Sequence, residues 1–195
     1  MSDDTNTLPL GDAGGEARLP HTRLSRAIDA LLNRLGSLAS WLWIAVIAAI
    51  VVNVVYRYVL ANNLGQLEEL QWHLYAAAFL IGLAYTVVHD EHVRVDVVYG
   101  SRSLKTKAWV DFVGILVFAL PFALFVLYHA WPFVWASYAS GERSANPSGL
   151  PYRFLIKGML PLAFLLLILA FVSRLSRTTA FLFGLPRPVA ARREG

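Results

Sequence analysis

Four long apolar stretches decide what this chain can fold into. The first lies at about 35–57 and includes 22 residues without a formal charge between Arg34 and Arg57. At about 1.5 Å per residue, a helix of that length crosses the ~30 Å hydrocarbon core of a bilayer. The others lie at about 69–88, 110–136 and 153–173. Since backbone polar groups in lipid must be satisfied internally, we predict an all-α integral membrane protein with four transmembrane helices.

Composition supports a membrane protein and argues against other classes. Hydrophobic residues make up 57% of the 195 positions and charged residues only 15%, which is too apolar for an ordinary soluble domain. The net charge is +4, but the basic residues flank the apolar stretches and form no single patch. We therefore expect no nucleic-acid partner. The chain has no cysteine, which excludes disulfides, thiolate metal sites and cysteine nucleophiles.

The ends of the chain differ from this membrane domain, which we place at 22–175. Residues 1–21 hold little apolar surface, so we expect a disordered N-terminus. Residues 176–195 form a basic tail. After Thr22, leucines and Ile28 recur at helical spacing opposite arginines. Two interpretations stay open for this segment, namely an amphipathic helix on an anionic membrane surface and an extension of the first helix into water.

The distribution of Lys and Arg predicts the orientation in the membrane. The N-terminal segment, the second connection and the tail hold 13 of these residues, whereas the first and third connections hold 4. Cytoplasmic segments carry the excess of positive charge in membrane proteins. We therefore expect both termini and residues 90–107 to be cytoplasmic.

Polar residues near the outer end of the first two helices form a candidate contact. Asn53 and Arg57 follow two alanines at steps of four residues, and Glu68 and Glu69 come one loop later. Polar groups at membrane depth are costly unless they are paired. We predict that Arg57 pairs with one of the two carboxylates, or that these carboxylates contact another protein.

Small residues on the second helix are a second candidate interface. Ala78, Gly82 and Thr86 lie four residues apart, a spacing that permits close approach of another helix. That helix belongs either to this chain or to a partner subunit, and a leucine at Gly82 is expected to push the two helices apart.

The second connection holds a third group of candidates. His92, Arg94 and Asp96 alternate with valines, so they share one side only if the segment is extended. In the third stretch, we expect Pro121 and Pro132 to kink or end the helix.

No catalytic motif is present, so we expect neither an enzyme nor a catalytic, metal or cofactor site. One alternative remains. His73 in the second helix and His129 in the third lie at similar expected depths, and two such histidines on facing helices bind a b-type haem in some membrane redox subunits.

The sequence from Leu67 to Tyr99, LEELQWHLYAAAFLIGLAYTVVHDEHVRVDVVY, resembles the second-helix region of the small membrane subunit of TRAP transporters, the DctQ-like family. Residues 53–58 and 149–166 extend the resemblance, and within the family the chain looks most like the mannitol/chloroaromatic-type class.

This resemblance implies a function and partners. The chain is expected to be the small permease subunit of a sodium-coupled secondary transporter that takes up organic anions across the bacterial inner membrane. Its partners are expected to be the large membrane subunit, a periplasmic substrate-binding protein and membrane lipid. Small subunits of this family lack the substrate and sodium sites, so the implied role is that of a scaffold.

Overall fold

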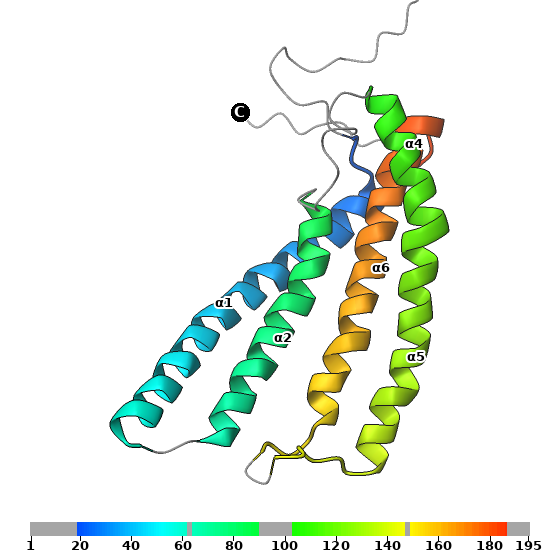
Figure 1. Cartoon of the computed structure of the whole chain (residues 1–195). Helices are drawn as coiled ribbons and strands as arrows, with labels where there is room; N and C mark the ends of the chain where they lie inside the picture. The colour runs from blue at the N-terminus through cyan, green and yellow to red at the C-terminus, as the bar shows by residue number, and fades with distance from the viewer. Residues whose placement is uncertain (1–18, 62–63, 90–102, 147–148, 187–195) are drawn as a thin grey trace, which may run out of the picture.

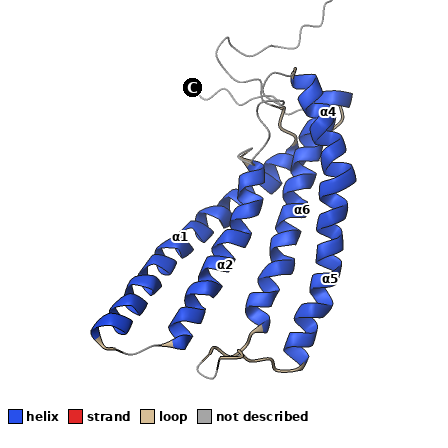
Figure 2. Ribbon diagram, in the orientation of Figure 1, coloured by secondary structure: helices blue, strands red, loops and turns tan. Residues whose placement is uncertain are grey.

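The computed structural model describes residues 19–61, 64–89, 103–146 and 149–186 (Figure 1). All the regular structure in these ranges is helical (Figure 2). Four spans are long and apolar enough to cross a membrane, which confirms the predicted fold class. The helices are α1 (Arg23–Val59), α2 (Gly65–Val88), α4 (Leu104–Gly114), η1 (Ile115–Ala119), α5 (Leu120–Ala139) and α6 (Phe154–Phe183).

The helices form two hairpins that lie side by side. The first hairpin is α1 with α2, and the second is the continuous α4–η1–α5 span with α6. In space the order is α1, α2, α6, α5, because α6 packs against both α2 and α5 (Figure 1). We call the end where α1 and α4 begin and α2 and α6 finish the termini end, and the opposite end the hairpin end. The two hairpins converge at the termini end and diverge toward the hairpin end (Figure 1).

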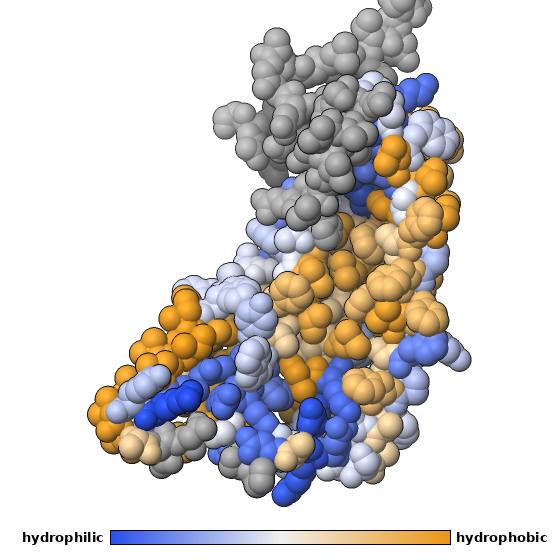
Figure 3. Space-filling model, in the orientation of Figure 1, coloured by the Kyte–Doolittle hydropathy of each residue, from blue (hydrophilic) through white to orange (hydrophobic). Residues whose placement is uncertain are grey.

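The apolar core lies in the half nearer the termini end. Ile28 and Leu32 of α1 meet Ala84 and Val87 of α2 and a small group on α6, namely Leu166, Leu167 and Ala170. Alanines in this core let the helix backbones approach closely. Most other large apolar side chains are exposed, and apolar residues gather over the middle of the face shown in Figure 3. That surface suits a lipid environment.

α1 is one unbroken helix from Arg23, so residues 23–35 extend the first span and form no separate interfacial helix among the described residues. Thr22 caps it. The Thr22 hydroxyl accepts a hydrogen bond from the Ser25 backbone N–H (3.0 Å), and the Ser25 hydroxyl accepts one from the Thr22 N–H (2.9 Å), which is the reciprocal pattern of a capping box. Both side chains are fully buried.

The prolines do not end the third span. The turn before Pro121 widens into the π-helix η1, in which the Leu120 N–H bonds to the Ile115 carbonyl. A wide turn of this kind relieves the clash that a proline ring makes with the carbonyl four residues earlier. Pro132 lies inside α5. α6 also runs on to Phe183, so the first residues of the expected tail, 176–183, are its last turns.

Candidate functional site

A buried ion pair joins α4 to α6 at the termini end. The Arg174 guanidinium donates two hydrogen bonds to Asp111 Oδ2, from Nη2 at 2.5 Å and from Nε at 3.1 Å. The side chains are only 9% and 11% exposed. Hydrogen bonds between ionised partners are roughly twice as strong as those between neutral groups. This pair therefore fixes the start of the third span against the end of the fourth.

A second buried polar contact joins α1 to α6 at the same end. The Ser173 hydroxyl donates to Asp29 Oδ1 at 2.6 Å, while Asp29 Oδ2 lies 3.8 Å from His21 Nδ1. One turn away, the hydroxyls of Thr22 and Ser176 are hydrogen-bonded at 2.8 Å. Asp29 and both serines are buried. The polar end of α6 thus holds the first turns of α1.

The hairpin end is joined by part-buried contacts. Glu69, in the first turns of α2, accepts a hydrogen bond from the Ser144 hydroxyl and one from the Leu150 backbone N–H (2.7 Å). A Cβ added at Gly149 would overlap Ser144 and lie 2.7 Å from Glu69 Oε1. A side chain at Gly149 would therefore displace Ser144 and Glu69, where the connection of the second hairpin reaches α2 of the first.

A second contact closes the connection between α5 and α6. Glu142 binds Lys157 and lies 3.7 Å from Arg153 Nε. The hydrogen bond from Lys157 lowers the pKa of the Glu142 carboxyl below its usual value. The Lys157 ammonium also lies 4.2 Å from the centre of the Phe133 ring, a cation–π contact. These contacts tie the start of α6 to the end of α5.

The predicted pair between Arg57 and the acidic residues is wrong. Arg57 and Glu68 are exposed, and within the described ranges no ion pair includes Arg57. The last turn of α1 diverges from the rest of the bundle (Figure 1). α1 and α2 are joined instead by Gln71, whose amide donates to the Ala49 carbonyl at 3.0 Å. Asn53 is half-buried, and its Oδ1 accepts no hydrogen bond from the described residues.

The small residues of α2 have different surroundings. Ala78 is 2% exposed, and the Thr86 hydroxyl bonds to its own helix at the Leu83 carbonyl (2.9 Å). A Cβ added at Gly82 would meet no described atom within 4 Å. An alanine-sized side chain at Gly82 therefore does not push helices of this chain apart, and the expected effect of a leucine there stays a prediction. The tight approach is at Gly36 of α1, where an added Cβ would overlap the Tyr85 ring.

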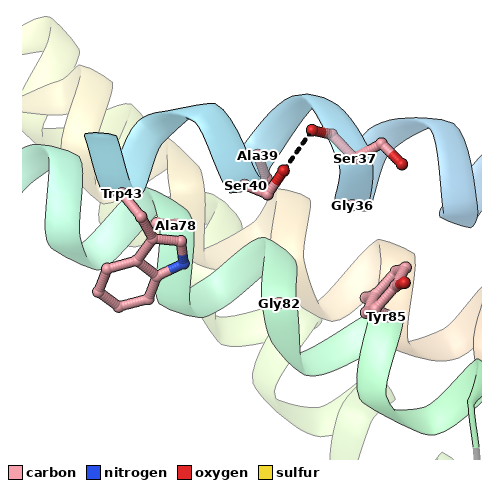
Figure 4. Close-up of a pocket in the computed structure, with 8 residues that line it drawn as sticks. All are labelled: Gly36, Ser37, Ala39, Ser40, Trp43, Ala78, Gly82 and Tyr85. Atoms are coloured by element: carbon pink, nitrogen blue, oxygen red, sulfur yellow. Dashed lines mark hydrogen bonds between the residues drawn. The ribbon is translucent and has the colours of Figure 1, made fainter. Parts of the chain in front are cut away.

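The open space beside Gly82 is a pocket of 290 Å³ between α1 and α2. Figure 4 shows Trp43 at one end and Tyr85 at the other. The residues that line the pocket are Gly36, Ser37, Ala39, Ser40 and Trp43 of α1 with Ala78, Gly82 and Tyr85 of α2.

The two candidate haem ligands do not face each other. α6 lies between α2, which carries His73, and α5, which carries His129 (Figure 1). The Nδ1–H of His73 donates to the Glu69 carbonyl (2.6 Å), and that of His129 to the Phe125 carbonyl (2.9 Å). Because α6 separates the two helices, the arrangement gives the haem interpretation no support.

The remaining candidates, His92, Arg94 and Asp96, lie outside the described residues. Over the part of the chain that the structure describes, no group of three or more His, Cys, Asp or Glu side chains is placed to hold a metal ion.

Sequence reasoning missed the residues with the best-defined contacts, namely Asp29, Asp111, Arg174 and Gly36. Asp111 stands near the start of the third apolar stretch, where a carboxylate is favoured by the helix dipole, and nothing in the local sequence indicates its distant partner Arg174. The one available signal was that charged residues beside apolar stretches need partners.

The chain matches one known family over most of its length. Residues 46–181 match the family described as "Tripartite ATP-independent periplasmic transporters, DctQ component". No curated protein and no solved structure matches the chain.

Proposed function

Because the chain belongs to the DctQ component family of tripartite ATP-independent periplasmic (TRAP) transporters, we propose that it braces the large membrane subunit of such a transporter. Membership makes the chain the small, multi-pass membrane subunit of the complex, a transporter component and not an enzyme. It also implies association with a large membrane subunit and a periplasmic binding protein, and a place in the bacterial inner membrane.

The observation that carries the bracing role is that side chains tie the two hairpins together at both ends. Asp29 and Ser173 join them at the termini end, and Glu69 and the connection after Ala139 join them at the hairpin end. Contacts at both ends oppose rotation of one hairpin against the other. A subunit with that property suits the stationary part of a transporter whose substrate-carrying part moves.

We also propose a substrate class, a coupling ion and a subclass for the transporter. The complex takes up an organic anion with sodium, and the mannitol/chloroaromatic-type class is the proposed subclass. These proposals rest on the resemblance of residues 53–58, 67–99 and 149–166 to the family. The connections at the hairpin end are proposed to help dock the binding protein.

We propose that the termini end of the bundle faces the cytoplasm. The excess of Lys and Arg, 13 against 4, supports this. Because the chain has no cysteine, the exposed residues Lys105 and Ala145 offer a matched pair of labelling positions. A membrane-impermeant maleimide added to whole cells should label Ala145→Cys and spare Lys105→Cys, and the opposite pattern would reverse the orientation.

The bracing proposal is tested by deletion and co-purification. Cells that lack this chain should lose uptake, and the large subunit should co-purify with the wild-type chain in mild detergent. The purified chain alone should bind neither the transported anion nor haem. Uptake that persists without the chain, or anion binding by the chain alone, would contradict the proposal.

A further inference from the structure

Two unpaired arginines lie on the outer surface of the first turns of α1. Arg23 and Arg26 are exposed, and within the described ranges neither guanidinium takes part in a hydrogen bond or an ion pair. Residues three positions apart are neighbours on a helix, with Cβ atoms about 5–6 Å apart. Asp29 is the one acidic residue at 19–34, and it is buried against Ser173. The outer surface of this segment is therefore cationic.

The arginine pair lies near the edge of the membrane. Charged side chains are costly in hydrocarbon, so the buried polar contacts of Asp29 and Asp111 mark the edge of the hydrocarbon core at the termini end. Arg26 and Arg23 precede Asp29 by three and six residues, which is about 4.5 and 9 Å along the helix. Their depths differ by less, because α1 slants relative to α6 (Figure 1). The headgroup layer is about 5–7 Å thick on each side of a bilayer, so both guanidinium groups reach it.

Exposed leucines lie beside the arginines. Leu24 is 50% exposed and Leu31 is 46% exposed, and their spacing of seven residues places them on the same side of the helix. The first turn of α1 has no acidic residue, and a positive side chain is unfavourable at the positive end of the helix dipole. The arginine pair therefore gains from an anion, while the leucines gain from an apolar cover. A phospholipid with a negatively charged headgroup supplies both in one molecule.

We propose that Arg23 and Arg26 together bind the phosphate of an anionic phospholipid, with Leu24 and Leu31 against its acyl chains. The inference goes beyond the bracing function, and it rests on the proposed orientation only in assigning the lipid to the cytoplasmic leaflet. Anionic lipids of that leaflet attract basic residues next to a transmembrane helix, and a guanidinium binds phosphate through charge-assisted hydrogen bonds. A lipid bound there holds the start of α1 at the membrane edge, next to the contact between Asp29 and α6.

A lipid titration of the purified full-length chain, read by native mass spectrometry, tests this inference. Each basic residue near an anionic surface contributes about fivefold to binding, so the wild type should prefer phosphatidylglycerol to phosphatidylcholine by about 25-fold. The double variant Arg23→Gln with Arg26→Gln should bind the two lipids alike. The matched control is Arg57→Gln with Arg143→Gln, which removes the same charge from two exposed residues at the hairpin end and should keep the preference.

Two further measurements separate the lipid from other ligands. Millimolar inorganic phosphate should leave phosphatidylglycerol bound, because the leucines contact only a lipid. Release of the lipid by phosphate, a wild type without preference, or an equal loss of preference in the control would overturn the inference.

Recovery of the large subunit in mild detergent tests the competing occupant, and both double variants should recover it as the wild type does. If Arg23→Gln with Arg26→Gln lost the large subunit but kept the preference for phosphatidylglycerol, the arginines would contact that subunit and the lipid inference would be overturned. The bracing function would then still stand, since only uptake that persists without the chain, or anion binding by the chain alone, contradicts it.

Discussion

The two ends of the bundle are held together in different ways. At the termini end, ionic and hydroxyl groups are buried between helices, and the apolar core lies directly beside them. At the hairpin end the contacts involve part-buried residues of the connection between α5 and α6, while the hairpins diverge and the last turn of α1 stands apart (Figure 1).

The difference indicates where the fold is determined and where it is adjustable. A buried ion pair is costly to break because the partner left behind stays buried and uncompensated. A contact at the surface loses little, because water replaces the missing partner. The termini end is therefore expected to set most of the stability of the subunit, whereas the Glu69 contacts at the hairpin end oppose rotation of the hairpins and add less to stability.

The largest loss of stability is expected when the buried pair Asp111–Arg174 is broken. Arg174→Ala should destabilise the subunit by about 3–5 kcal/mol, because the buried Asp111 carboxylate loses both hydrogen bonds from the guanidinium. Thermal unfolding in detergent measures the loss. The double variant Asp111→Leu with Arg174→Met is the control, and it should recover most of the stability, since apolar residues of similar volume often replace a buried pair without cost. A single variant as stable as the wild type would show that the pair does not hold the termini end.

The second largest loss of stability is expected where α1 crosses α2. Gly36→Ala should destabilise the subunit by about 1–3 kcal/mol, because the added methyl group overlaps the Tyr85 ring. Gly158→Ala on α6 should instead leave stability unchanged or raise it by up to about 1 kcal/mol, because alanine is the better helix former and its methyl meets open space. Unfolding of the two variants under identical conditions measures the contrast, and equal effects would place the close approach elsewhere.

A smaller and local effect is expected at Glu69. Glu69→Ala removes the acceptor for the Ser144 hydroxyl and the Leu150 N–H. Hydrogen exchange should become faster at Leu150 and in the first turn of α6, with little change at the termini end. Faster exchange in α1 near Asp29 would show that the two ends are coupled more tightly than their contacts indicate.

The smallest effect is expected from the Glu142 contact, and it depends on pH. A carboxyl whose pKa is lowered in the folded state adds stability above its unfolded value near 4.5 and loses that contribution as the pH falls below it. Lys157→Met removes the largest cause of the lowered pKa. The fall in unfolding temperature between pH 6 and pH 4 should therefore be smaller in this variant. An unchanged pH dependence would mean that other carboxyls dominate it.

The sequence predicts how many helices span the membrane, but it does not predict where each helix ends. Apolar length predicted four helices, because crossing a bilayer needs a fixed number of residues. The polar residues at 173–178 resemble the start of a tail, yet they continue α6 because Ser173, Arg174 and Ser176 find partners on α1 and α4. Those partners are distant in the sequence, and local spacing carries no information about them.

The choice between glycines shows the same limit. Gly82 belongs to a regular pattern of small residues, and Gly36 belongs to none that the sequence analysis recognised. Gly36 is nevertheless the one that meets a neighbouring ring. Which face of a helix meets its neighbour depends on the angle at which α1 crosses α2, and spacing along one helix does not determine that angle.

The central claim is that this subunit is a stationary brace, and a distance measurement within the assembled transporter tests it most directly. Trp72 on α2 and Leu155 on α6 are exposed at the hairpin end, where the hairpins are least constrained. Spin labels on Trp72→Cys and Leu155→Cys report the distance between the hairpins by double electron–electron resonance, in the presence and absence of the transported anion. We predict one narrow distance distribution that is the same in both states. A distribution that shifts or divides when the anion is added would show that the subunit moves with the transport cycle, and it would contradict the bracing account.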